Sequence, residues 1–234
     1  MFVDRIDAGR RFAEKLLWVR EEADKLKGHG EGNRLVILAI PRGGLIIGDV
    51  IASSLGGKLD IVVSRKIGAP FNQEFAIGAI MPDGTCFLNT GTVEVFQIPQ
   101  QYIATKAEEQ IKEINRRLEA YRGQKEYDNE LEGKIVILVD DGIATGSTIY
   151  AAAQWVKAQK CRKLVIAVPV GPKDIIEILQ QIADMVVVID APISFQAVGE
   201  FYRDFRQVTD EEVKTIMRRY GYKPVVGYSE NFAG

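Results

Sequence analysis

Short, continuous apolar runs alternate with helical segments along this chain, and few architectures accommodate that alternation. The clearest run is Ile135–Val139, and an earlier one is Leu35–Ile40; a helical stretch follows each of them. Apolar runs of this length are typical of strands that are buried on both faces, as in a parallel sheet covered by helices. The sequence therefore predicts an α/β fold built on a doubly wound parallel sheet.

The length of the chain suits one domain with a small appendage. Its 234 residues fit a single α/β domain over residues 1–234. Apolar residues at helical spacing predict an N-terminal helix over about residues 7–27. We expect this helix and a C-terminal segment, about residues 190–221, to form a small hood.

Charge and hydropathy argue against two classes of partner. The net charge is −2 and the sequence pI is about 5.7, so no overall positive field would attract nucleic acid. No apolar stretch is long enough to span a bilayer, and the N-terminus lacks the apolar run of a signal peptide. We therefore expect a cytoplasmic protein, in which only a local basic groove could attract nucleic acid.

The segment between the strand Ile135–Val139 and the helix expected from Ser147 holds the most informative polar groups. Asp140 and Asp141 follow the strand, and a turn with two glycines and three hydroxyl side chains comes next. Right-handed crossovers bring the loops after parallel strands to one edge of the sheet, where such folds bind ligands. Backbone N–H groups in a glycine turn and at a helix N-terminus bind anions, and paired acids suit the vicinal hydroxyls of a sugar.

A plainer explanation of this segment is an aspartate cap beside a glycine turn, which any strand-to-helix junction can contain. Such a junction does not require two acids, two glycines and three hydroxyls together. The segment also lacks the Gly-Lys-Ser/Thr of a P-loop and the Gly-x-Gly-x-x-Gly of a dinucleotide site.

The segment resembles the phosphoribosyl-pyrophosphate signature of the type I phosphoribosyltransferase family. Over nearly the whole chain, including residues 72–79 and 197–205, the sequence resembles a group of bacterial and archaeal predicted phosphoribosyltransferases whose acceptor is not settled. The resemblance implies that Asp140 and Asp141 bind the ribose hydroxyls of 5-phosphoribosyl-1-pyrophosphate (PRPP). It also implies that the turn binds the 5-phosphate, through Gly142, Ile143, Ala144, Thr145, Gly146, Ser147 and Thr148.

Two other segments agree with this family. Ile40–Gly44 stands where the family has its pyrophosphate loop, so Arg42 and Gly43 are candidate pyrophosphate ligands, with a cis peptide expected at Arg42–Gly43. The alternative is an ordinary glycine turn.

The second segment, Ser64–Gly68, resembles the opening of the mobile catalytic loop in orotate and adenine phosphoribosyltransferases. It marks Arg65 and Lys66 as catalytic candidates, with the loop over about residues 67–76. The alternative is a solvated charge pair. Glu74, the only acid in that loop, receives no role.

The resemblance implies transfer of ribose 5-phosphate to a nitrogen of a nucleobase or related acceptor, with release of pyrophosphate. Mg²⁺ is the implied cofactor and would arrive with the substrate, with Asp140 and Asp141 as possible ligands. Phe195 is a weak candidate for stacking on the base. Ala144 stands where 6-oxopurine enzymes often have an Asp, which disfavours hypoxanthine and guanine as acceptors. A homodimer is expected.

The alternative function is a PRPP-sensing regulator of the same fold without catalysis. Such regulators usually add a basic surface or a helix-turn-helix module, and the sequence contains no recognisable DNA-binding domain. The Arg65–Lys66 pair favours catalysis. The acceptor and the pathway are not readable from the residues.

Overall fold

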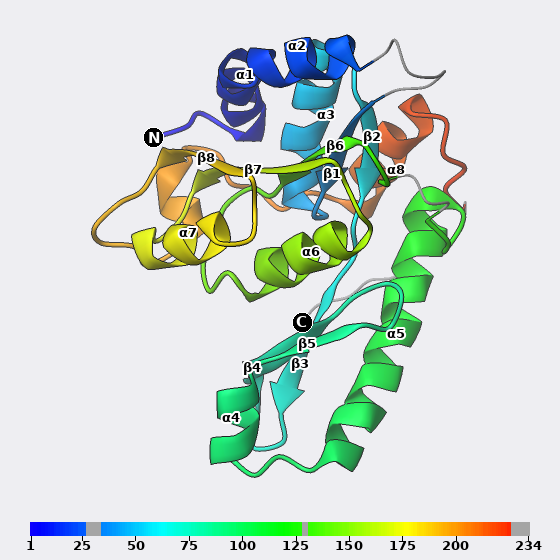
Figure 1. Ribbon diagram of the computed structural model, residues 1–234, viewed down its shortest axis with the longest axis vertical. Coiled ribbons are helices and arrows are strands. Elements are labelled where there is room, and N and C mark those ends of the chain that lie inside the picture. Colours follow the sequence, from blue (N-terminus) through cyan, green and yellow to red (C-terminus); the bar gives the residue numbers. More distant parts are fainter. Residues whose placement is uncertain (27–33, 128–130, 226–234) are drawn as a thin grey trace.

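A five-stranded parallel sheet forms the centre of the molecule in the computed structural model, which describes residues 1–26, 34–127 and 131–225 (Figure 1). The strand order is β2-β1-β6-β7-β8. The strands are β1 (Leu35–Ala39), β2 (Lys58–Ile61), β6 (Ile135–Val139), β7 (Lys163–Val170) and β8 (Met185–Asp190). The predicted α/β class and parallel sheet are confirmed.

Helices cover both faces of this sheet, which explains why its strands are apolar throughout. Leu35 and Ile37 of β1 pack in one core with α1 (Arg5–Lys15) and α3 (Gly43–Leu55). Val36 and Leu38 of β1 pack in a second core with α6 (Ser147–Ala158) and α7 (Lys173–Gln180). Since successive side chains of a strand point to opposite faces, a strand between two cores has no polar position.

The two central strands end at the same edge of the sheet. β1 and β6 pair residue by residue, from Leu35 opposite Ile135 to Ala39 opposite Val139. The segments that follow them therefore emerge side by side. A Cβ atom added to Gly44, in the first turn of α3, would lie 2.8 Å from the carbonyl oxygen of Val139, so only glycine permits this approach.

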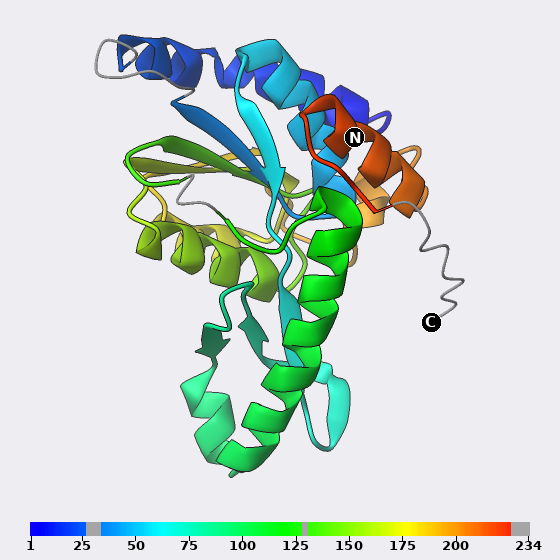
Figure 2. The same ribbon diagram turned by 90° about the vertical axis from the view of Figure 1, so that its right-hand side faces the viewer.

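A second lobe projects from the carboxyl edge of the sheet (Figures 1 and 2). It contains an antiparallel sheet in the order β3-β4-β5, followed by two helices. Its elements are β3 (Arg65–Ala69), β4 (Asn72–Ile80), β5 (Cys86–Leu88), α4 (Thr90–Val95) and α5 (Gln100–Arg122). Figure 2 shows α5 running along the lobe from its tip back to the central sheet.

The segment expected as a loop over residues 67–76 forms the hairpin β3–β4, and that this segment is mobile stays a prediction. Pro70 and Phe71 make its turn, and Ile67 pairs with Gly78. The register shifts at Gly68, where an added Cβ would lie 2.3 Å from the carbonyl oxygen of Gln73. Half of β4 is solvent-exposed, so it lacks the apolar pattern of a buried strand.

The prediction of a single helix over residues 7–27 is also wrong in its bounds. The chain forms α1 (Arg5–Lys15) and then α2 (Leu17–Lys25), and residue 27 lies outside the described residues. Asp4 caps α1 by accepting a hydrogen bond from the Asp7 N–H at 2.8 Å. Leu16 separates the helices with a non-helical backbone, and its side chain is fully buried.

The two terminal segments lie against each other. Phe2 forms an isolated parallel bridge with Tyr202, and its N–H donates to the carbonyl of Phe201 at 2.7 Å. The C-terminal segment continues through the 3₁₀ helix η2 (Val198–Phe201) to α8 (Asp210–Arg219). That these segments act as a hood stays a prediction. Among the described residues, no helix is long and apolar enough to cross a membrane.

A buried ion pair fixes the second lobe to the central sheet. Arg122, the last residue of α5, donates from Nε and Nη2 to the two carboxylate oxygens of Asp60 in β2, at 2.8 and 2.9 Å. The Arg122 and Asp60 side chains are 0% and 2% exposed. The guanidinium also lies 4.2 Å from the ring centroid of Tyr127.

We predict that Arg122→Met lowers the free energy of unfolding by roughly 3–5 kcal/mol, because it leaves the buried Asp60 carboxylate without its partner. Urea denaturation at pH 7 measures this loss. Arg20→Met is the control, since the Arg20–Asp24 pair is about half exposed, and its loss should stay below about 1 kcal/mol. Equal losses in the two variants would contradict the structural role of the buried pair.

Candidate functional site

A cavity of about 1760 Å³ opens at the carboxyl edge of the central sheet, between the sheet and the second lobe. Ligand pockets commonly measure about 300–1,000 Å³, so this cavity has room for a sugar phosphate and a second molecule. Its wall brings together most of the predicted site residues: Arg42, Gly43, Arg65, Lys66, Asp140, Asp141, Thr145, Gly146, Ser147 and Thr148.

The paired acids lie where β6 ends, and their surroundings differ. Asp141 Oδ2 accepts a hydrogen bond from Arg5 Nε at 2.7 Å and forms an ion pair with it. Asp140 Oδ1 accepts a hydrogen bond from the N–H of Asp141 at 2.8 Å. Asp140 forms no ion pair within the described part of the chain, so one of the two acids stays available to a ligand.

Burial raises the pKa of the Asp140 carboxyl well above its usual value of 3.8. The negative charge of Asp141 raises the pKa of Asp140 further, and the positive charge of Arg5 opposes this in part. The unliganded site therefore disfavours the charged form of Asp140.

The turn after the acids combines an anchor with an open hydroxyl cluster. Ile143 is 2% exposed, and its N–H donates to the carbonyl of Val170 at 2.8 Å, which fixes the turn to β7. Gly146 has a φ of 74° directly before α6, a left-handed conformation that favours glycine. The hydroxyls of Thr145 and Ser147, on either side of this glycine, lie 3.1 Å apart beside the helix N-terminus.

Three predicted phosphate ligands do not line the cavity: Gly142, Ile143 and Ala144. A Cβ on Gly142 would lie 2.4 Å from Val198 Cγ1, so this glycine permits close packing against the C-terminal segment. Gly142 and Ile143 therefore pack against the protein, Ala144 is solvent-exposed, and the turn lines the cavity from Thr145 onward.

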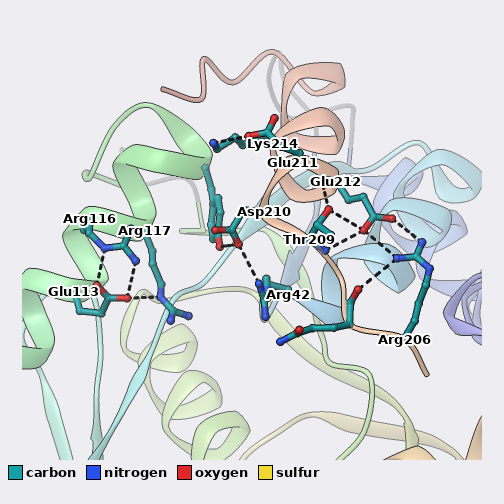
Figure 3. A network of polar contacts seen from close by, with 12 residues as sticks. Arg42, Glu113, Arg116, Arg117, Arg206, Thr209, Asp210, Glu211, Glu212 and Lys214 are labelled. Atoms are coloured by element: carbon teal, nitrogen blue, oxygen red, sulfur yellow. Dashed lines mark hydrogen bonds and ion pairs between the residues drawn. The ribbon is translucent and has the colours of Figure 1, made fainter. Parts of the chain in front are cut away.

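The loop between β1 and α3 lies directly beside the acids. A Cβ on Gly43 would lie 1.8 Å from Asp141 Oδ2, so no side chain fits between them. Arg42 Nη1 donates to Asp210 Oδ1 of α8 at 3.2 Å (Figure 3). The cis peptide is at Pro41–Arg42 and not, as expected, at Arg42–Gly43, because α3 begins at Gly43 and a helix is built from trans peptides.

The two catalytic candidates come from the first strand of the second lobe. Arg65 Nε donates to Gln110 Oε1 of α5 at 2.9 Å. Lys66 Nζ donates to Glu74 Oε2 across the hairpin β3–β4, and the Glu74 side chain is 84% exposed. Both cations therefore line the cavity from the lobe, opposite the acids of the sheet edge.

The candidate base-stacking residue lies elsewhere. The Phe195 ring stacks on Phe201, with centroids 5.6 Å apart and planes at 10°, and Phe195 is not among the residues that line the cavity. A different aromatic residue, Phe205, lines the cavity, and the guanidinium carbon of Arg5 lies 4.0 Å from the centroid of its ring. The stacking of a base on Phe195 stays a prediction.

Two cavity cations were missed by sequence reasoning, Arg5 of α1 and Arg117 of α5. Arg5 lies 136 residues from its partner Asp141 in the chain, and it also donates to the carbonyl of Arg206 at 2.8 Å. Each stands in a charged helix among other lysines and arginines, so no local pattern distinguishes it.

Comparisons with known proteins find a family model, curated relatives and a solved structure that are similar to this chain. The family model described as phosphoribosyl transferase domain matches residues 9–202. A Mycobacterium tuberculosis H37Rv protein named "Putative phosphoribosyl transferase" is 39% identical over 219 residues, which are 94% of this chain and 47% of that protein. This chain thus spans about half the length of the curated relatives it matches. The crystal structure of the protein TT1426 from Thermus thermophilus is 37% identical, with a TM-score of 0.75 over 94% of this chain and 99% of that chain.

We predict that Asp140→Asn raises the free energy of unfolding of the unliganded protein at pH 7 by about 0.5–2 kcal/mol, a usual size for a stabilising substitution at a functional site. A raised pKa means that the folded protein favours the protonated acid. The wild-type protein therefore loses stability as the pH rises above 3.8 and through the raised pKa.

Urea denaturation of the wild type and the variant as a function of pH tests this prediction. The difference between the two proteins should shrink as the pH falls below 3.8, where the wild-type acid becomes neutral in both states. A variant less stable than the wild type at pH 7 would show that the Asp140 charge is satisfied in the free protein.

Proposed function

Because this chain belongs to the phosphoribosyl transferase domain family, we propose that it binds PRPP in the cavity and transfers ribose 5-phosphate to a nitrogen nucleophile. One observation supports this above others: the acid pair, the hydroxyl turn and the cations of the β1–α3 loop and of β3 line the same cavity. These groups match the three parts of PRPP, which are a sugar diol, a phosphate monoester and a pyrophosphate.

In this proposal the sheet edge binds the sugar phosphate. Asp140 and Asp141 accept hydrogen bonds from the ribose hydroxyls. These hydrogen bonds would form in addition to the contacts that the two acids already make in the free protein. Thr145, Ser147 and Thr148 donate hydroxyl hydrogen bonds to the 5-phosphate, together with backbone N–H groups at the N-terminus of α6. The helix end alone contributes only about 0.3–1 kcal/mol, so the charge-assisted hydrogen bonds supply most of the affinity.

The cations bind the leaving pyrophosphate. Arg42 and Arg65 are half-buried, with their guanidinium groups held by Asp210 and Gln110. Among the described residues, Lys66 pairs only with the exposed Glu74. Such pairs contribute about 0–1 kcal/mol, so a phosphate can replace Glu74 at little cost. As the C1–O bond to pyrophosphate breaks and the C1–N bond forms, these cations stabilise the charge that develops on the leaving group.

The donor set fits Mg²⁺ bound jointly by protein and substrate. Asp140 and Asp141 present carboxylate oxygens, the ligands that Mg²⁺ prefers, and the described residues contain no group of three or more acids, histidines or cysteines that could hold a metal. The two acids would share the ion with PRPP oxygens and water. When bound, Mg²⁺ supplies Lewis-acid stabilisation of the pyrophosphate charge.

The acceptor is a nucleobase or a related nitrogen compound in this proposal. The acceptor nitrogen attacks C1 while the residues above align the ribose, and its proton passes to solvent. The expected homodimer and the cytoplasmic location stay predictions.

We predict that PRPP with Mg²⁺ raises the free energy of unfolding of the wild type by about 2.7 kcal/mol at a hundredfold excess over the dissociation constant. The double variant Asp140→Asn, Asp141→Asn should lose this gain, because amides do not replace two carboxylates toward the diol and the metal. Thermal shift with and without PRPP measures it. An unchanged gain in the double variant would refute the ribose assignment.

We further predict Mg²⁺-dependent pyrophosphate release when the protein, PRPP and a panel of purine and pyrimidine bases are mixed. Omitting the base should reduce the release to the rate of PRPP hydrolysis, and Arg65→Ala should reduce it by roughly 10²–10³-fold, as for a lost transition-state donor. PRPP binding without release for any base would instead support a PRPP-sensing regulator.

A further inference from the structure

The cavity wall formed by α5 carries a guanidinium group that no motif of the sequence marks. Arg117 lines the cavity together with Arg42 and Arg65. Its side chain is 31% exposed, and it stands one helical turn after Glu113. The residue therefore contacts its own helix surface and also borders the space proposed to hold PRPP.

The contacts of Arg117 leave its binding groups available. Its Nε donates to Glu113 Oε1 at 2.7 Å, which fixes the direction of the side chain (Figure 3). Within the described part of the chain, its two terminal nitrogens make no hydrogen bond. A guanidinium held at Nε with two free terminal nitrogens is ready to bind a phosphate by a pair of parallel hydrogen bonds.

Positive charge exceeds negative charge on this wall. Arg116 and Arg117 both bind one acid, Glu113, and the hydrogen bonds of Arg116 first and Arg117 second lower the pKa of Glu113 to about 2. Arg65 is held by the neutral Gln110. Burial lowers the pKa of Arg65, and the positive charge of Arg117 lowers it further.

Arg42, in the loop between β1 and α3, is the third arginine of this group that lines the cavity. Its partner Asp210 also accepts from the Tyr121 hydroxyl at 2.6 Å. Burial raises the pKa of Asp210, but the hydrogen bonds from Tyr121 and Arg42 and the charges of Arg42 and Arg117 outweigh burial and lower it. Arg42, Arg65 and Arg117 thus have only two carboxylate partners between them in the part of the chain that the structure describes. Such an arrangement favours a ligand with several negative charges.

We propose that Arg117 is a further pyrophosphate-binding residue, acting with Arg42 and Arg65 on the leaving group of PRPP. This inference rests on the proposed function. Pyrophosphate fits this wall because its two phosphoryl groups can bridge guanidinium groups of α5, β3 and the β1–α3 loop. The 5-phosphate has its own ligands at the turn before α6, so it does not need this wall.

The test compares two ligands and two neighbouring arginines. Calorimetry should give the dissociation constants of Mg-pyrophosphate and of ribose 5-phosphate for the wild type, Arg117→Ala and Arg116→Ala. Arg116 is the matched control, since it binds the same Glu113 from the same helix but does not line the cavity. We expect Arg117→Ala to weaken pyrophosphate binding about 10- to 100-fold, as for a lost charge-assisted hydrogen bond, and ribose 5-phosphate binding less than about 3-fold.

Arg116→Ala should change both dissociation constants less than about 3-fold. For Arg117→Lys, the dissociation constant of Mg-pyrophosphate should lie between those of Arg117→Ala and the wild type, because lysine keeps the charge but lacks the paired N–H donors of a guanidinium. Unchanged pyrophosphate binding in Arg117→Ala, or an equal loss in Arg116→Ala, overturns the inference while wild-type binding of both ligands still supports the proposed function. A wild type that binds neither ligand overturns both.

Discussion

The carboxylate of Asp141 lies where three segments far apart in the chain meet, and the geometry of the site depends on that contact. Arg5 of the N-terminal helix binds it, Gly43 of the β1–α3 loop leaves room for it, and the Tyr202 hydroxyl donates to the backbone carbonyl of Asp141 at 2.7 Å. The parallel pairing of β1 with β6 brings the β1–α3 loop to Asp141. The isolated bridge between Phe2 and Tyr202 holds the two terminal segments together.

Most cations of the cavity are paired with acids of the same chain. Arg5, Arg42, Lys66 and Arg117 each have an acidic partner, namely Asp141, Asp210, Glu74 and Glu113. The partners differ in exposure, and the exposed ones bind weakly enough for a phosphate to replace them. The free protein thereby avoids a cluster of unpaired like charges, which would repel each other and destabilise the compact state.

The central parallel sheet, and the acids and glycines of the site, could be predicted from local sequence patterns. Ile135–Val139 is buried on both faces, so its apolar run predicted β6 with the correct bounds, and the acids and glycines after it marked the cavity edge. The hairpin β3–β4 was not predicted, since Gly68, Pro70 and Asn72 at and beside its turn, together with the exposed first half of β4, resemble a loop. Arg5 and Arg117 were missed because tertiary contacts alone select them from other charged helix residues.

The buried Asp60–Arg122 pair fixes the C-terminal end of α5 to the central sheet, whereas Tyr102 near the other end donates its hydroxyl hydrogen bond to Gly68 of the lobe itself. Arg117 stands five residues before the anchor, a distance of about 7.5 Å along the helix axis, whereas Gln100 at the other end lies about 33 Å away. A rocking of the lobe about that anchor would displace the tip of the hairpin and α4 several times farther than it displaces Arg117. The anchor that joins the lobe to the sheet thus lies close to Arg117, so it holds this guanidinium near the sheet edge more firmly than it holds the tip of the lobe.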